Sequence, residues 1–337
     1  MDKVRLGRTN IVVNKNGFGA LPIQRISQEE ARDIMRKAYA NGVDFFDTAR
    51  AYSDSEEKIG ATFSPEERKN IYIATKTSAK SAETFWNHLE TSLKNLNTSY
   101  IDIYQFHNPP FMPKPGGEDG LYDAMLEAKK QGKIKHIGIT SHKLHVAKEA
   151  VLSGLYETLQ FPFNFLSEKQ DEDVVKLCEE HDVGFIVMKG LSGGLITDSA
   201  LTYAHLNTYP SVLPIWGIQK ESELDEFLSY QVEAPILNEV RLEQIEKERA
   251  QLAGNFCRAC GYCMPCPAGI DIPQAARMSL LLRRAVASNF LSADYQKEMA
   301  KIDACIDCGK CIRNCPYELN TPELLRENYA DYKTFLK

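Results

Sequence analysis

The 337-residue sequence lacks several features that would assign it to whole classes of protein. It has no run approaching the roughly 18 apolar residues of a membrane-spanning helix, and Met1 to Arg5 lack the apolar core of a signal peptide. Its formal net charge of −6 gives no electrostatic reason to bind nucleic acid or anionic lipid. We therefore expect a cytoplasmic protein whose partners include neither nucleic acid nor membrane.

Cysteine is almost absent from the first three quarters of the chain. Only Cys178 precedes Cys257, and the other eight of the nine cysteines form two tight runs near the C-terminus. In a reducing compartment such runs are typical of metal sites rather than of disulfides. Cys178, alone in a helical pattern, is expected to be a small buried apolar residue.

Short apolar strands alternate with amphipathic helices through about the first 230 residues. Eight strands are predicted near Gly17–Pro22, Val43–Asp47, Ile71–Lys76, Ile101–His107, Ile134–Ser141, Thr158–Phe163, Gly184–Lys189 and Val212–Ile218. Eight strand–helix units predict an α/β fold, a closed (β/α)₈ TIM barrel. An open doubly wound sheet is the alternative, but Gly17–Pro22 does not have the spacing of its Gly-rich phosphate turn.

Three regions follow from this pattern. Residues 1–232 are predicted to form the barrel, 233–254 a linking helix, and 255–337 a small, mainly helical domain that carries the cysteines. Within the last region Ala275–Ala287 has a strong helical pattern. The weakest part of the barrel pattern is the link between its second and third strands, where only 55–61 predicts a helix.

Titratable side chains follow three successive predicted strands: Asp47, with Tyr52 five residues later, then Lys76 and His107. The carboxyl ends of barrel strands form one rim, so these side chains are expected to lie together. An adjacent ammonium lowers the pKa of a phenol, which is ordinarily about 10, and a carboxylate keeps that ammonium charged. Such a set suits general acid catalysis during reduction of a carbonyl group. Singly, each has a structural alternative, such as a capping Asp, a buried Tyr or a solvated Lys.

The Asp-x₄-Tyr interval, Ala74-Thr75-Lys76 and Gln105-Phe106-His107 resemble the aldo/keto reductase superfamily, over roughly residues 1–230. The resemblance implies an NAD(P)H-dependent oxidoreductase that acts on a small-molecule aldehyde or ketone. It implies that Tyr52 is the general acid, that Lys76 tunes its pKa, that Asp47 pairs with Lys76, and that His107 positions the carbonyl.

The resemblance also implies a dinucleotide groove. The residues expected to hold the nicotinamide are Thr140, Ser141, Gln160 and Met188, where the family commonly has an aromatic in place of Met188. Those expected along the pyrophosphate and adenosine are Leu191, Ser192, Gly193, Gly194, Gly217 and Lys220. Glu221 and Glu223 would repel a 2′-phosphate there, so NADH or a flavin is an alternative to NADPH.

The two cysteine runs are C-x₂-C-x₂-C-x₂-C-P from Cys257 and C-x₂-C-x₂-C-x₃-C-P from Cys305. The second is the run with which bacterial ferredoxins hold [4Fe–4S] clusters, the last Cys of each run serving the other cluster. The first run is one residue shorter before its last Cys. This rule predicts two clusters, with the ligand sets Cys257, Cys260, Cys263 and Cys315, and Cys305, Cys308, Cys311 and Cys266.

Zinc is the alternative, although a zinc ribbon needs only two thiolates from each C-x₂-C pair. The segment Cys260–Pro267 and the helical spacing between the runs resemble a subgroup of aldo/keto reductases with a ferredoxin-type tail.

The sequence leaves three functions open. A nicotinamide transfers two electrons as hydride, whereas a cluster transfers one, so the two halves of the chain cannot exchange electrons directly. The barrel could be a plain carbonyl reductase with structural or redox-sensing clusters. Electrons could instead pass between the barrel and the clusters through a flavin or a substrate radical, which would admit a redox partner protein. The third possibility is a redox-sensing binding module, which would not need a proton donor such as Tyr52.

Overall fold

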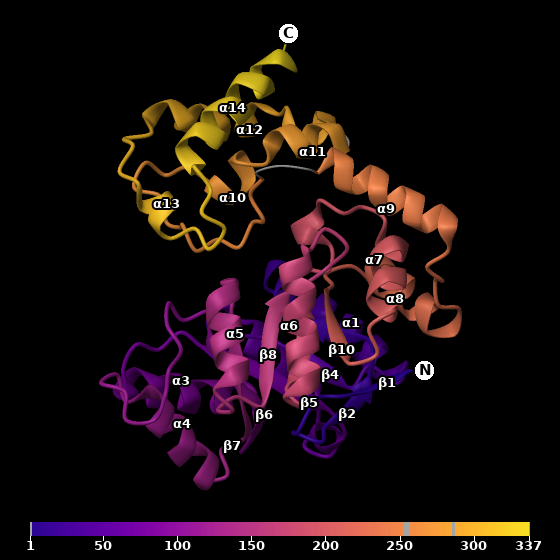
Figure 1. Ribbon diagram of the computed structural model, residues 1–337, viewed down its shortest axis with the longest axis vertical. Coiled ribbons are helices and arrows are strands. Elements are labelled where there is room, and N and C mark those ends of the chain that lie inside the picture. The colour runs from indigo at the N-terminus through magenta and orange to yellow at the C-terminus, as the bar shows by residue number, and fades with distance from the viewer. Residues whose placement is uncertain (1, 253–255, 285–286, 337) are drawn as a thin grey trace. The chain divides into compact units, whose positions relative to one another are not determined.

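The computed structural model describes residues 2–252, 256–284 and 287–336 (Figure 1). By their contacts the residues form two compact units. The first comprises Met1–Gly190 and Ala200–Asn238, and the second comprises Leu191–Ser199 and Glu239–Lys337. No helix among the described residues is both long enough and apolar enough to span a bilayer.

The first unit contains a closed barrel of parallel strands, which confirms the predicted fold. Neighbouring strands follow chain order around the barrel, and the last pairs with the first. The strands are β3 (Gly17–Gly19), β4 (Phe45–Asp47), β5 (Tyr72–Thr77), β6 (Ile101–His107), β7 (Ile134–Thr140), β8 (Thr158–Pro162), β9 (Gly184–Met188) and β10 (Val212–Gly217). Their register places Asp47 beside Ala74, Lys76 beside Gln105 and His107 beside Thr140, so the titratable strand ends meet at one rim.

Helices follow the strands and cover the outside of the barrel, as α5 and α6 do at β8 and β9 (Figure 1). They are α1 (Gln28–Ala40), α2 (Ser55–Thr62), α3 (Ala82–Asn95), α4 (Leu121–Lys130), α5 (Leu144–Leu152), α6 (Lys169–Glu180), α7 (Ser199–Asn207) and α8 (Glu221–Val232). The first of them begins with a capping box formed by Ser27 and Glu30. It buries Ala31, Ile34, Met35 and Ala38, the spacing of one apolar helix face.

A two-stranded hairpin packs at the amino ends of the barrel strands. Strand β1 (Lys3–Arg5) pairs antiparallel with β2 (Val12–Asn14). Its apolar side chains share a core with Phe45, Ala74 and other inward-facing residues of the strands. Because side chains on one face of a strand are two residues apart, Phe45 and Ala74 lie one layer below Asp47 and Lys76. The hairpin therefore fills the end of the barrel away from the polar rim.

The second unit is mainly helical, as predicted. Its helices are α9 (Glu239–Gln251), α10 (Ile272–Ala275), α11 (Met278–Arg284), α12 (Ala293–Ala300), α13 (Lys310–Arg313) and α14 (Thr321–Thr334). The single helix predicted over Ala275–Ala287 is wrong at its start, because a turn at residues 276–277 separates α10 from α11. Residues 285–286 of that prediction lie outside the described chain.

Candidate active site

Lys76 and Asp47 form a buried ion pair at the carboxyl end of β5 and β4. The Lys76 Nζ donates to Asp47 Oδ1 at 2.6 Å and to the Thr48 carbonyl at 2.6 Å. The side chains of Lys76 and Asp47 are 1% and 4% exposed. Burial raises the pKa of Asp47, and the Lys76 ammonium acts in the opposite direction. Each charge therefore depends on the other, because neither has access to water.

Tyr52 lies against this pair, on the loop between β4 and α2. The Lys76 Nζ is 5.2 Å from the centre of the Tyr52 ring. The ring of His107 meets it edge to face, with 5.8 Å between the two centres. Burial raises the pKa of Tyr52, while the Lys76 ammonium lowers it and the Asp47 carboxylate raises it. The phenol is therefore protonated at neutral pH and can donate its proton.

His107 is a neutral group in this setting. Burial, and then the nearby charge of Lys76, lowers the pKa of His107 to about 3. A neutral imidazole can donate one hydrogen bond and accept another. The structure thus brings together the side chains of Asp47, Tyr52, Lys76 and His107, which come from three strands and one loop.

Two glutamines complete the floor of this site. Gln105 Nε2 donates to Gln160 Oε1 at 2.9 Å and lies 3.5 Å from Asp47 Oδ2. Gln160 Nε2 lies 3.4 Å from Asp47 Oδ1. Gln105 was not among the site residues predicted from the sequence. Its position two residues before His107 on β6, and hence on the same inward face, is the signal that could have found it.

The residues predicted to hold the nicotinamide lie at the carboxyl ends of β7, β8 and β9. Thr140, Ser141 and Gln160 are buried, and Met188 is half-buried. The Thr140 hydroxyl accepts the Asn108 N–H at 2.9 Å, and Ser141 N donates to the Gln160 carbonyl at 3.1 Å. Because Thr140 pairs with His107 across β6 and β7, this polar patch is continuous with the catalytic candidates.

Leu191, Ser192, Gly193 and Gly194 belong by their contacts to the second unit. Arg277 Nη1 donates to the Gly193 carbonyl at 2.6 Å, and Arg284 Nε donates to the Leu195 carbonyl at 2.7 Å. Ser192, Gly193 and Gly194 all have positive φ, at 49°, 66° and 92°. Successive residues in this conformation can turn their N–H groups toward one anion.

Gly217 and Lys220 lie at the end of β10 and just before α8. The Glu223 carboxylate accepts hydrogen bonds from the N–H groups of Gln219, at 2.9 Å, and Lys220, at 3.1 Å. Glu221 and Asp225 lie 2.6 Å and 2.5 Å from the Lys37 ammonium. The amides at the start of α8 that could otherwise bind an anion are therefore occupied by a carboxylate of the chain itself.

Six cysteines of the second unit lie in or against its apolar core: Cys257, Cys263, Cys266, Cys305, Cys311 and Cys315. Five cysteines line one small pocket: Cys263, Cys266, Cys305, Cys308 and Cys311. The last four are those that the exchange rule assigns to one cluster, whereas Cys263 is assigned to the other. Burial, and then the nearby Cys257 and Cys260, raises the pKa of Cys263 to about 12. In the described chain, no three His, Cys, Asp or Glu side chains form a group that could hold one metal ion. Soft thiolates in sets of this kind suit an iron–sulfur cluster.

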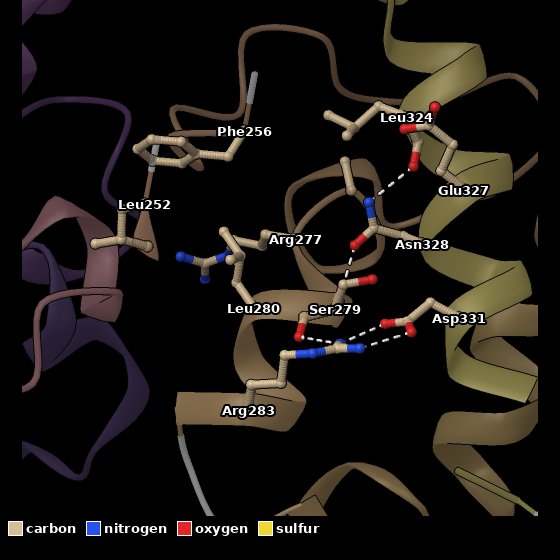
Figure 2. Close-up of a pocket in the computed structure, with 11 residues that line it drawn as sticks. Leu252, Phe256, Arg277, Ser279, Leu280, Arg283, Leu324, Glu327, Asn328 and Asp331 are labelled. Atoms are coloured by element: carbon tan, nitrogen blue, oxygen red, sulfur yellow. Dashed lines mark hydrogen bonds and ion pairs between the residues drawn. The ribbon is translucent and has the colours of Figure 1, made fainter. Parts of the chain in front are cut away.

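A separate cavity of about 390 Å³ lies between α11, α14 and the end of α9. Figure 2 shows Arg283 paired with Asp331 at one side of it, through bonds of 2.5 Å and 2.8 Å. The Asn328 side chain accepts the Ser279 N–H at 2.9 Å. These polar contacts join α11 to α14 in the second unit.

Comparisons with known proteins identify the families that the two parts of the chain match. The profile of the aldo/keto reductase family matches residues 15–240, and that of a 4Fe-4S dicluster domain matches residues 256–320. The uncharacterized oxidoreductase YqkF of Bacillus subtilis (strain 168) is 27% identical over 60% of this chain and 69% of its own length. The NADH-specific methylglyoxal reductase of Escherichia coli (strain K12) is 24% identical over 58% of this chain and 69% of its own.

Solved structures show the same fold. The holo form of aldo-keto reductase AKR11C1 from Bacillus halodurans has a TM-score of 0.64 at 23% identity, covering 74% of this chain and 96% of that one. An aldo-keto reductase from Klebsiella pneumoniae in complex with NADPH has a TM-score of 0.63 at 19% identity, covering 73% and 94%. At these identities the likeness concerns the barrel, and the chemistry must be argued from the site.

Proposed function

This chain belongs to the aldo/keto reductase family and carries a 4Fe-4S dicluster domain, and we propose that its barrel reduces a small aldehyde or ketone with NADH or NADPH. The observation that carries the proposal is the grouping of a phenol, an ammonium, a carboxylate and a neutral imidazole at one rim. A binding module has no need of a buried ammonium held beside a phenol.

The side chains have separate roles in this reaction. The reduced nicotinamide would supply hydride to the carbonyl carbon. Tyr52 gives its proton to the carbonyl oxygen, which yields the alcohol, and the resulting phenolate regains a proton from solvent. Lys76 favours the phenolate and so makes Tyr52 a stronger acid than burial alone would allow. Asp47 holds the Lys76 ammonium in place, and the neutral His107 can donate a hydrogen bond to the carbonyl oxygen.

The cofactor groove would use Thr140, Ser141, Gln160 and Met188 at the nicotinamide and Leu191, Ser192, Gly193 and Gly194 at the pyrophosphate. Near Gly217 and Lys220, the carboxylate of Glu223 supports NADH rather than NADPH. A phosphate dianion at the start of α8 would meet this negative charge and would find two of the amides already bonded.

The cysteines would hold two [4Fe–4S] clusters, one on Cys257, Cys260, Cys263 and Cys315 and the other on Cys305, Cys308, Cys311 and Cys266. We assign these clusters a structural or redox-sensing role. The dicluster domain itself supports a second candidate, in which electrons pass one at a time through a flavin or a substrate radical to a partner protein.

The proposal is tested with anaerobically purified protein and a panel of small aldehydes and ketones. Oxidation of NADH or NADPH that depends on the carbonyl compound is expected, and Y52F should lower kcat at least a hundredfold because the proton donor is lost. Activity that survives bleaching of the clusters supports the plain reductase. A yellow chromophore released from the protein would instead favour the one-electron route, and an unchanged rate in Y52F would refute the role of the phenol.

A further inference from the structure

Arg50 and Glu56 form an ion pair that joins the loop carrying Tyr52 to the strand carrying Lys76. We propose that these two are positioning residues, which hold the Tyr52 phenol at a fixed distance from the Lys76 ammonium. The proposal rests on the function proposed above and deepens it, because it names what sets the acidity of the proton donor.

The loop is tied to β5 before it reaches Tyr52. Thr48 N donates to the Ala74 carbonyl at 2.8 Å, and Arg50 N donates to the Lys76 carbonyl at 3.0 Å. These bonds continue the pairing of β4 and β5 past the end of the strand. They connect the backbone of the loop directly to the backbone of the residue whose ammonium faces Tyr52.

The Arg50 side chain holds the loop on the other side of Tyr52. Its Nη2 donates to the Ser53 carbonyl at 3.3 Å, and its Nη1 pairs with Glu56 Oε2. Ser53, directly after Tyr52, is therefore held by the side chain of Arg50, which lies two residues before Tyr52. Ser53 has a φ of 35°, a conformation that non-glycine residues rarely adopt and that needs such support.

Glu56 transfers this restraint to β5. Its side chain is 1% exposed, and its Oε1 accepts a hydrogen bond from the Thr75 hydroxyl at 2.7 Å. Thr75 directly precedes Lys76, and its side chain points to the outer face of the strand while that of Lys76 points inward. The chain of contacts from Ser53 through Arg50, Glu56 and Thr75 thus ends one residue from the catalytic lysine.

Two further ionisable groups near this pair, His88 and Tyr104, carry no charge at neutral pH. Burial, and then the positive charge of Arg50, lowers the pKa of His88, whose Nδ1 lies 2.9 Å from the Thr77 hydroxyl. Burial raises the pKa of Tyr104, and the Glu56 carboxylate raises it further. Arg50 is thus the cation that pairs with the buried Glu56 side chain, and removing one partner of a buried ion pair is strongly destabilising.

Distance is the reason why this restraint matters for catalysis. The effect of an ammonium on the pKa of a phenol falls as the two move apart. A misplacement of about 1 Å at a reacting group can cost about a hundredfold in rate. Loosening the loop would therefore lower kcat and weaken the influence of Lys76 on Tyr52, without changing any group that touches the cofactor.

The barrel offers a matched control pair. Arg68 Nη2 lies 2.7 Å from Asp102 Oδ2, with side chains 7% and 9% exposed. Asp102 also accepts the Ile73 N–H at 2.9 Å, near the amino ends of β5 and β6. This is a buried Arg–carboxylate pair that also bonds to β5, but at the amino end of the strand, away from Tyr52. Its loss should cost stability without altering the phenol.

The experiment compares E56Q, R50Q and R50K with D102N in the full-length, cluster-containing enzyme. We expect E56Q and R50Q to lower kcat at least tenfold while the KM for NADH changes less than twofold. Protonated Tyr52 is the active form, so weaker coupling to Lys76 raises its pKa and moves the alkaline limb of the kcat profile to higher pH. R50K, which keeps the charge, should recover part of kcat. D102N should lower the midpoint of thermal unfolding but leave the alkaline limb in place.

Hydrogen exchange tests the positioning role separately from the proposed reductase function. Hydrogen exchange of the peptide over residues 48–56 should be at least tenfold faster in E56Q and R50Q than in wild type or D102N. If the wild-type enzyme reduces no carbonyl compound, the proposed function fails, and the exchange rates still test the restraint. If kcat, its alkaline limb and the exchange rates in E56Q and R50Q match those of D102N, the positioning role is wrong.

Discussion

The Lys76 ammonium lies 2.6 Å from the Asp47 carboxylate, and both side chains are almost completely removed from solvent. A buried charge whose partner is removed is costly, typically about 3–5 kcal/mol. The same ammonium is the group that lowers the pKa of Tyr52. The Lys76–Asp47 pair therefore affects both the stability of the folded protein and the acidity of Tyr52, and mutations can separate the two effects.

We expect K76M to lower kcat by a factor of about 10² to 10⁴, because the phenol loses the charge that makes it acidic. It should also lower the free energy of unfolding by about 3 kcal/mol, because Asp47 is left buried without a cation. The double variant K76M/D47N should recover stability but not activity, since its neutral pair needs no counter-charge. Kinetics and chemical denaturation measure the two quantities, and a recovery of activity in the double variant would contradict this division.

The low pKa of His107 predicts how stability depends on pH. That pKa is about 3 in the folded protein, below the ordinary value of 6.5, so the unfolded chain binds a proton at a higher pH. Acidification from pH 6.5 toward 3 therefore favours unfolding, by about 1.4 kcal/mol for each pH unit from this residue. We expect H107Q to lose about 2 kcal/mol less than wild type between pH 7.5 and pH 5, measured by denaturant titration of the barrel. Equal losses in the two proteins would show that His107 is not held neutral by the fold.

Removal of single cysteines tests the assignment of the cluster ligands. C266S should lose the iron of the cluster on Cys305, Cys308 and Cys311, so that the content falls from roughly eight irons to four. Cys178 provides the control, because it is 1% exposed in the barrel and far from both runs in sequence. C178S should keep all of its iron, and a loss of all iron in C266S would mean that the two clusters do not form independently.

Coenzyme choice is expected to depend on Glu223. Its carboxylate bonds to the N–H groups of Gln219 and Lys220 at the start of α8. We predict that wild type has a lower KM for NADH than for NADPH, and that E223Q lowers the KM for NADPH severalfold because the amide keeps the shape but removes the repulsion. E226Q, which removes the same charge one turn later on α8, should change neither value. A wild-type preference for NADPH would show that Glu223 does not face the 2′-position.

The barrel could be predicted from the sequence because its strands are short, mainly apolar runs, several of which end in a polar residue or glycine, as β4, β6 and β10 do. Asp47, Lys76 and His107 are visible in the same way, since they stand where apolar runs stop. The bonds of Gln105 to Gln160, and of Glu223 to the start of α8, could not be predicted, because they depend on how side chains are oriented once the barrel is closed.

The break between α10 and α11 is a feature of the second unit that the sequence pattern did not predict. The pattern over Ala275–Ala287 is continuous in its apolar spacing, yet α10 ends at Ala275 and α11 starts at Met278. The Asp271 side chain caps α10 by accepting the Gln274 N–H at 3.3 Å, and this helix starts at Ile272, three residues earlier than the pattern suggests. The turn that follows directs Arg277 toward the Gly193 carbonyl, a contact between residues 84 positions apart.

The loop of residues 191–199 provides the last prediction, because arginines of the cysteine-rich sequence hold it. Arg277 and Arg284 donate to the carbonyls of Gly193 and Leu195. If this loop binds the pyrophosphate as we propose, R277Q should raise the KM for NADH at least fivefold while kcat at saturation stays within twofold of wild type. Arg283 is the matched control, because in the described chain its side chain bonds to the Ser279 carbonyl and to Asp331 on α14 (Figure 2). R283Q should destabilise the cysteine-rich unit but leave the KM unchanged, so equal KM values in R277Q and R283Q would show that the loop does not need Arg277.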